Sequence, residues 1–337
     1  MFNKKIINID NLISNIKQVK ANNPNSKLCV MVKANAYGVG LETIDYIDSL
    51  VDYYGVACFF EAKNLINRTN KPILITGAID DEIDERFSYT CSSVDDVKIL
   101  MKLNKNIKIH IKVNTGMNRY GVESITKFIK MLDLIENSKL TLEGVYTHFA
   151  TSDEYVDIQY GKFNKYIQIV KDKGFNPIIH TDNSVVNKKK NHHQDMVRIG
   201  FDLFAYNVLS VKSRVVQINK VKKNDLVGYD KRFVAMKNLR VGIIPIGYAD
   251  GFDMRLIGKC LIIKGISCKI LNICMDCFMI DISNVNIKKG DDIFIIDDIH
   301  SIFSYAKYLD ISPYQVLTNF SFMRADKLIT SANREYK

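Results

Sequence analysis

The chain has 337 residues, of which 47% are hydrophobic and 25% charged, with 17 Gly, 5 Pro, 7 Cys and no Trp. This composition is that of a globular protein, and it excludes collagen, a continuous coiled coil and a long disordered chain. No apolar run reaches the roughly 20 residues that a membrane-spanning helix needs. We expect two domains, or one large barrel with an added module.

The charge balance is basic, with 47 Lys and Arg against 37 Asp and Glu and a formal net charge of +10. Such a balance indicates nucleic-acid binding only where the basic residues cluster and a recognition motif accompanies them. Here lysine is spread along the chain, and the one dense run is Lys188–Lys190. We therefore expect neither a nucleic-acid partner nor a membrane partner. Asp10 and Asn11 stand where a signal peptide would need its apolar core, so we expect a cytoplasmic protein.

The seven cysteines lie on apolar segments and are odd in number, which is typical of buried, reduced thiols. Cys274 and Cys277 form a lone C-x-x-C pair. A structural zinc site needs four ligands, and no second pair stands at a suitable spacing, so we expect no metal site. A redox pair would require a thioredoxin-like βαβ context, which is missing, so we interpret the pair as two core cysteines.

Short β-branched segments alternate with amphipathic stretches over the first two-thirds of the chain. Helical spacing of apolar residues predicts a helix before the first strand, with Asp10 as an early cap, and another over Ile125–Ile135. Alternating strands and helices predict parallel βα units, and eight of them predict a (β/α)8 barrel of the TIM type over residues 1–206. The eight expected strands are Leu28–Lys33, Tyr54–Phe59, Ile73–Thr76, Phe87–Cys91, Ile107–Val113, Leu142–Thr147, Ile178–Thr181 and Met196–Phe201.

The pattern of expected secondary structure changes after Tyr206. Short strands separated by Lys-, Asn- and Gly-containing turns predict a C-terminal, mainly β domain over residues 207–337, with residues 1–8 as candidates to join it. Little helix is expected there before Ile302–Leu309. The expected strands are Arg214–Val221, Phe233–Met236, Val241–Ile246, Cys260–Ile263, Cys268–Ile273, Met279–Ile282 and Ile293–Ile296.

Several polar residues stand at the ends of barrel strands, which is where enzymes of this fold carry their chemistry. Lys33 follows the first strand and is open to three interpretations: a phosphate contact, a Schiff-base nucleophile or a snorkelling side chain. Lys112 and Arg119 flank a Gly turn and form either an anion site or a solvated loop. His148 ends the sixth strand, as an acid/base group or as a structural histidine.

The loops after the seventh and eighth barrel strands commonly bind phosphate. Ser184 and the Gly200 amide are therefore candidate phosphate donors, beside His180 and Arg198. In the β domain, Tyr229 and Tyr248 stand at Gly-containing turns, as exposed functional groups or as aromatic turn residues that pack on a neighbour. Each signal is weak alone, but the barrel candidates all fall at the ends of different strands.

Six motifs occur in a fixed order along the chain: VKANAYG, KVNTGMNRYG, YTHFATSDE, VGYD, IGYADGF and ICMDC. Together they resemble the bacterial alanine racemases, and the resemblance runs from Ile9 to about Arg324. It implies a barrel followed by a β domain, the cofactor pyridoxal 5'-phosphate (PLP), and interconversion of L-alanine and D-alanine by two bases. It also implies a supply of D-alanine for peptidoglycan and a homodimer whose subunits share their active sites.

The resemblance also implies roles for single residues. Lys33 is similar to the Schiff-base lysine, and Tyr229 to the second catalytic base, which reaches the partner subunit's site. Arg198 resembles the arginine on the pyridine nitrogen, with His148 and His180 supporting Arg198 and the tyrosine. Lys112 matches a lysine that is often carbamylated to N6-carboxylysine. The remaining matches are the phosphate contacts Tyr37, Ser184, Gly200, Phe201 and Tyr314, and the substrate or entrance residues Arg119, Tyr248 and Met275.

The sequence departs from the family pattern without losing a catalytic group. Val39 stands where His is usual, Asn114 where Asp is usual, Asn207 where Gly is common, and Phe252 where Trp is frequent. These departures leave open a racemase of serine or of broader specificity on the same scaffold. Two further alternatives are a basic-amino-acid decarboxylase of the same fold type, which the tyrosine motifs disfavour, and a non-catalytic PLP carrier, which Tyr229 disfavours.

Overall fold

The structure is a computed structural model that describes residues 1–151, 153–181, 195–331 and 334–336. The chain divides into two compact units, and each is described by itself. The barrel unit comprises Asn15–Ala36 and Leu41–Asp202, and the β unit comprises Met1–Ser14, Tyr37–Gly40 and Leu203–Lys337. None of the helices in the described part of the chain is both long and apolar enough to cross a bilayer.

The barrel unit contains an eight-stranded parallel sheet, in the order β8-β7-β6-β5-β4-β3-β2-β9. All eight strands expected from the sequence are present. They are β2 (Lys27–Met31), β3 (Tyr53–Val56), β4 (Ile73–Ile75), β5 (Phe87–Cys91), β6 (Lys108–Lys112), β7 (Thr141–Tyr146), β8 (Ile178–His180) and β9 (Met196–Ile199).

Side-chain hydrogen bonds join the two edges of this sheet. The Ile179 N–H of β8 donates to Asp195 Oδ2, just before β9, over 2.8 Å. Arg198 of β9 donates to the Thr181 carbonyl, just after β8, over 3.2 Å. The sheet therefore curves into a nearly closed barrel, as the eight βα units predicted.

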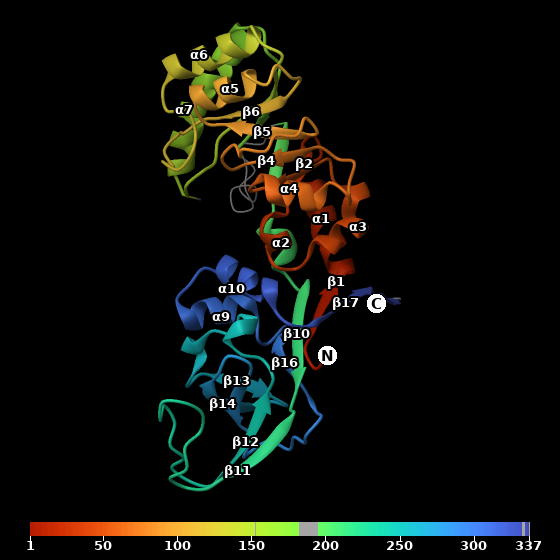
Figure 1. The fold of residues 1–337 in the computed structure, drawn as a ribbon, viewed down its shortest axis with the longest axis vertical. Helices are drawn as coiled ribbons and strands as arrows, with labels where there is room; N and C mark the ends of the chain where they lie inside the picture. The colour runs from red at the N-terminus through yellow and green to blue at the C-terminus, as the bar shows by residue number, and fades with distance from the viewer. Residues whose placement is uncertain (152, 182–194, 332–333, 337) are drawn as a thin grey trace. The chain divides into compact units, whose positions relative to one another are not determined.

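Helices follow most of these strands (Figure 1). On α6, Phe128, Met131, Leu132 and Ile135 form a buried stripe at helical spacing, and the Ser124 side chain caps the first turn. The helical segments of this part of the chain are α1 (Ile9–Asn22), α2 (Lys33–Tyr37), α3 (Ile44–Ile47), α4 (Phe59–Leu65), α5 (Val94–Met101), α6 (Ile125–Glu136), α7 (Tyr155–Asp172) and α8 (Phe201–Phe204), with 3-10 turns at Leu41–Thr43 and Asp48–Leu50.

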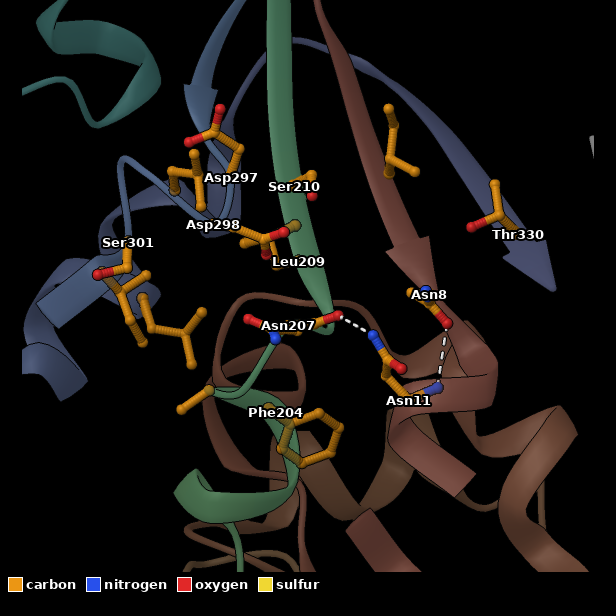
Figure 2. A pocket seen from close by; sticks show the side chains of 15 residues that line it. Asn8, Asn11, Phe204, Asn207, Leu209, Ser210, Asp297, Asp298, Ser301 and Thr330 are labelled. Carbon is orange, nitrogen blue, oxygen red and sulfur yellow. Dashed lines mark hydrogen bonds between the residues drawn. The ribbon is translucent and has the colours of Figure 1, made fainter. Parts of the chain in front are cut away.

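The start of α1 corrects one sequence expectation. The side chain that caps the helix belongs to Asn8, whose Oδ1 accepts from the Asn11 N–H over 3.0 Å (Figure 2). Asp10 lies inside the first turn, because the helix begins at Ile9. Its negative charge there still favours the helix N-terminus.

The β unit holds two antiparallel or mixed sheets, which confirms a mainly β C-terminal domain. One sheet has the order β16-β10-β1-β17-β18 and the other β11-β12-β15-β14-β13. Figure 1 shows the long β10 strand between β1 and β16. The strands are β1 (Lys4–Asn8), β10 (Leu209–Arg214), β11 (Gln217–Val221), β12 (Leu239–Ile244), β13 (Cys260–Ile263), β14 (Ile266–Ile273), β15 (Phe278–Asp281), β16 (Asp292–Ile296), β17 (Asp326–Ser331) and β18 (Arg334–Tyr336).

Helix α9 covers Ile302–Leu309, as predicted, and is followed by α10 (Pro313–Asn319). The same unit contains 3-10 turns at Tyr248–Asp250, Met254–Leu256 and Phe320–Phe322. The strand expected over Phe233–Met236 is wrong. That segment makes a single bridge, between Leu226 and Val234, because it belongs to an irregular loop rather than to either sheet.

Candidate active site

Lys33 lies two residues after the end of strand β2 and precedes an unusual left-handed turn. Ala34, Asn35, Ala36 and Tyr37 all have φ between 52° and 56°, where non-glycine residues are strained by roughly 1–2 kcal/mol each. Glu61 of α4 holds this turn, because its carboxylate accepts from the Ala34 N–H and the Ala57 N–H, both over 2.7 Å. The backbone after Lys33 is thus fixed to the end of the neighbouring strand.

The Lys33 amine lies half-buried in a cationic neighbourhood. Burial lowers its pKa below the ordinary value, the charge of Arg119 lowers it further, and the charge of Glu61 opposes both. The amine therefore loses its proton more readily than an exposed lysine, which is a property that a nucleophile or a general base needs.

Lys112 is the last residue of β6 and is 5% exposed. Its Nζ lies 5.4 Å from the centroid of the Tyr120 ring and 5.5 Å from that of the Tyr146 ring. Burial lowers the Lys112 pKa to about 7, with help from the charges of Arg119, Arg198 and Lys33. A large fraction of this amine is therefore neutral near neutral pH.

Arg198 of β9 is held on several sides. Its Nη1 donates to His180 Nδ1, and its Nη2 donates to the Thr147 carbonyl over 2.9 Å. Its guanidinium also lies over the Tyr146 ring, 4.8 Å from the centroid. Burial and the charge of Arg198 lower the His180 pKa well below its ordinary value, so His180 is the neutral acceptor of this pair.

Two loops bring further groups to the same end of the barrel. Burial lowers the His148 pKa well below its ordinary value, and so do the charges of Arg198, Arg119, Lys112 and Lys33. Arg119 is exposed, on a loop that Asn114 caps by accepting from the Gly116 and Asn118 N–H groups over 3.1 and 3.0 Å. An amide at this position therefore does the capping that the usual aspartate would do.

The remaining cofactor candidates of the barrel unit lie after β8 and β9. Gly200 follows β9 directly, and the 5% exposed Phe201 begins α8. Ser184 lies outside the described residues. Sequence reasoning missed Glu61 and the ring of Tyr146, although Tyr146 begins the YTHFATSDE motif.

In the β unit, Tyr37 packs between two aromatic rings. Its ring centroid lies 5.9 Å from that of Phe204 and 6.2 Å from that of Tyr314. Gly38 follows with φ +87°, and a Cβ there would lie 2.8 Å from the Leu317 carbonyl oxygen, so a larger residue would clash. The structure thus brings the two tyrosines predicted to contact phosphate side by side.

Tyr229, Tyr248 and Met275, which the sequence placed on three separate motifs, line one groove of about 860 Å³ in the β unit. The Asn272 amide shapes it by donating to the Tyr229 carbonyl over 3.1 Å. The three side chains are 71%, 43% and 52% exposed. The groove therefore offers a phenol on an open surface.

The β unit also holds a smaller, more enclosed pocket of about 280 Å³. Figure 2 shows the side chains that line it. Asn11 joins its walls by donating from Nδ2 to the Asn207 carbonyl over 2.7 Å. Asn207 has φ 55°, a conformation that Asn tolerates and that explains the glycine common at this position. No predicted site residue lines this pocket.

Comparison with known families identifies the family of this chain. The profile described as "Alanine racemase, N-terminal domain" matches residues 7–208, and "Alanine racemase, C-terminal domain" matches residues 208–327. The chain belongs to the alanine racemase family. Alanine racemases are PLP enzymes, so the family membership agrees with the cofactor expected from the sequence.

Relatives and solved structures agree with this membership. An alanine racemase of Thermodesulfovibrio yellowstonii is 31% identical over 93% of this chain and 94% of its own length. An alanine racemase structure from Bacillus anthracis with bound L-Ala-P is 26% identical with a TM-score of 0.93, covering 100% of this chain and 97% of that one. A Bartonella henselae alanine racemase with covalently bound pyridoxal phosphate has the same fold, at 20% identity, a TM-score of 0.87, and coverage of 98% and 100%.

Proposed function

We propose that this chain interconverts L-alanine and D-alanine with PLP, using Lys33 and Tyr229 as two bases. The observation that carries the proposal is the meeting of four cationic side chains at one end of the barrel. These side chains come from different strands or loops: Lys33, Lys112, Arg119 and Arg198. Their positive charges lower the pKa values of Lys33, Lys112 and the neighbouring His148.

This donor set fits the cofactor and the substrate, because both are anionic. Among the charges of the described residues that act on the Lys33 amine, that of Glu61 raises its pKa and that of Arg119 lowers it. An ionised phosphate and an amino-acid carboxylate would add negative charge beside these cations. Lys33 would hold the cofactor covalently, and His148 would lie beside it. Tyr37, Ser184, Gly200, Phe201 and Tyr314 would contact the phosphate.

When bound, PLP makes the α-proton of an amino acid labile, because its ring delocalises the negative charge left on the α-carbon. Lys33 would accept or return that proton on one face, since its lowered pKa favours the neutral amine. Arg198 stays protonated and donates, so the ring nitrogen that faces it would remain an acceptor. Arg119, Tyr248 and Met275 would bind the alanine and limit the size of its side chain.

Tyr229 would serve the opposite face from a partner subunit, which makes the protein a homodimer with shared sites. The exposure of Tyr229 supports this, because an exposed phenol needs a second surface to become a catalytic group. Leu226 and Met236, on the same loop, are 52% and 79% exposed. Apolar side chains gathered on one loop are typical of an interface.

We also propose that the protein works in the cytoplasm and supplies D-alanine for peptidoglycan. All seven cysteines are free thiols, which suits a reducing compartment. The proposed supply of D-alanine for peptidoglycan follows from the proposed reaction, whose product from L-alanine is D-alanine.

The experiment is to incubate the purified chain with PLP and a panel of L-amino acids, and to measure D-amino-acid formation. Lys33→Ala is the control. We expect D-alanine to form fastest and the control to be inactive. Equal rates with serine would favour the broad-specificity alternative, release of CO2 from basic amino acids would favour a decarboxylase, and a yellow but inert protein would favour a PLP carrier.

A further inference from the structure

A chain of hydrogen bonds leads from Arg198 through the barrel interior. Arg198 Nη1 contacts His180 Nδ1, His180 Nε2 contacts His110 Nδ1 over 2.8 Å, and His110 Nε2 contacts Glu143 Oε2 over 3.2 Å. Both histidines are 0% exposed. His110 lies two residues before Lys112 on β6, so this series of hydrogen bonds runs from the candidate site toward the N-terminal ends of the barrel strands.

The residues at the two ends of this hydrogen-bond series, Arg198 and Glu143, determine which atom donates in each bond. Arginine has only donors, so His180 Nδ1 must accept, and a neutral His180 then carries its proton on Nε2. His110 must therefore accept at Nδ1 and donate from Nε2. Glu143 receives that bond as an ionised acceptor. Each neutral histidine is thus confined to the same tautomer, with the proton on Nε2.

The strand pairing places Glu143 at this position. Ile109 pairs with Leu142 and His110 with Gly144, so Glu143 is the extra residue of a β-bulge, a feature that re-aims side chains. A Cβ on Gly144 would lie 2.1 Å from His110 Nδ1, so the His110 ring requires a glycine opposite it. Glu143 and Gly144 of β7 therefore act together to position the His110 ring.

Glu143 is kept ionised by its surroundings. Burial alone would raise its pKa, but hydrogen bonds from His110, Ser88 and Lys108 lower it to about 2. Lys108 Nζ lies 3.1 Å from Oε1, and the Tyr53 hydroxyl donates to the same oxygen over 3.3 Å. Glu143 is therefore an acceptor over the whole working pH range.

We propose that His110 and Glu143 are positioning residues that lock the tautomer of His180 and thereby keep Arg198 aimed at the cofactor nitrogen. The proposal rests on the proposed function for its purpose, but the tautomer lock can be measured without activity. The chain is not a proton wire, because Arg198 does not release its proton. The hydrogen bonds instead fix the orientation of Arg198. Without Glu143, the buried His110 N–H loses its acceptor. If the hydrogen bonds then reversed direction, an N–H of His180 would point at the Arg198 guanidinium.

The first test uses the wild-type full chain labelled with 15N in its six histidines, with and without PLP. Imidazole nitrogen shifts and couplings distinguish the two neutral tautomers and the cation. We expect His110 and His180 to show the proton on Nε2 alone across pH 6–9. An Nδ1–H tautomer or an imidazolium at either residue would overturn the proposal, whether or not the protein racemises alanine.

The second test compares Glu143→Leu with Glu143→Gln, whose amide oxygen can still accept from His110. Glu143→Leu should weaken PLP binding about tenfold and give mixed histidine tautomers, because a buried donor is orphaned. Glu143→Gln should stay within about twofold of the wild type for PLP affinity. Equal losses in both variants, or no loss in either, would contradict the tautomer lock.

Ser88→Ala is the matched control. It removes another hydrogen bond to Glu143 and leaves the bond from His110 in place. We expect it to lower stability without changing the histidine tautomers. A tautomer change in this control would show that general destabilisation is enough, and would overturn the proposal. If Glu143→Leu does not fold, the wild-type spectrum still decides.

Discussion

The ring of Tyr146 lies flat against the ring of His180, with 4.6 Å between their centroids and 10° between their planes. The Tyr146 ring also makes two cation–π contacts: the Arg198 guanidinium lies 4.8 Å and the Lys112 amine 5.5 Å from its centroid. Tyr146 thus contacts two cations that lie on different strands, Arg198 on β9 and Lys112 on β6. Its hydroxyl is satisfied by Thr90 Oγ1 at 2.9 Å.

Replacing Tyr146 tests this support. Tyr146→Leu should lower the free energy of unfolding by about 3–5 kcal/mol and weaken PLP binding, because both a buried ring and two cation–π contacts are lost. Tyr146→Phe keeps the ring and should cost only about 1 kcal/mol for the Thr90 hydrogen bond. Urea unfolding and PLP titration measure the two effects. Similar losses in both variants would assign the role to the hydroxyl instead.

Lys112 should give the protein a distinct pH dependence. Its folded pKa is about 7, below the ordinary value near 10.4, so between these values the unfolded chain holds a proton that the folded chain does not. Stability should therefore rise with pH from 7 to 10, by up to about 1.4 kcal/mol per pH unit relative to Lys112→Met. Unfolding of both proteins in bicarbonate-free buffer measures the difference. Parallel curves would contradict the lowered pKa.

The neutral Lys112 amine should also react with CO2. The amine nitrogen bonds to the carbon and releases a proton, which turns the neutral amine into an anion that the charges of Arg119, Arg198 and Lys33 attract. We expect a carbamate signal in the 13C spectrum of protein in labelled bicarbonate, growing as the pH rises through 7. The signal should be missing in Lys112→Arg. Persistence of the signal in that variant would place the carbamate elsewhere.

The left-handed turn after Lys33 should depend on Glu61. Glu61→Ala removes both acceptors of the Ala34 and Ala57 N–H groups and should cost about 2–4 kcal/mol in unfolding free energy. It also removes the charge that raises the Lys33 pKa, so the amine should react with an aldehyde at lower pH. Glu61→Gln, which keeps one acceptor oxygen, is the control and should be milder. An unchanged Lys33 reactivity profile in Glu61→Ala would contradict this coupling.

Much of the fold could be predicted from the sequence because its signals are local. Eight β-branched segments, each followed by a loop or helix, marked the barrel strands, and helix Ile302–Leu309 was confirmed at both ends. Strand β1 was missed as a strand, because Lys4–Asn8 pairs with Leu209–Lys212 and Asp326–Thr330, which are remote in the sequence. Phe233–Met236 was misassigned, because this apolar segment belongs to a loop in which Ala235 is buried and Val234 and Met236 are exposed.

The site was predictable in part for the same reason. Strand ends pointed to Lys33, Lys112, His148 and Arg198, since chemistry in a barrel gathers there. The strained turn from Ala34 to Tyr37 could not be foreseen, because none of its residues is glycine and the Glu61 that holds it lies on another element. The domain boundary at residue 206 and the roles of the single site residues stay predictions.

We propose that each active site combines Lys33 of one subunit with Tyr229 of its partner. The measurement is the rate of D-alanine formation by purified mixed dimers of Lys33→Ala and Tyr229→Phe, which carry different tags. In such a dimer one site has both lesions, and the other has neither. We expect about half the wild-type rate, because one of the two sites is intact. A rate no higher than that of either parent variant, in dimers shown to be mixed, would contradict it.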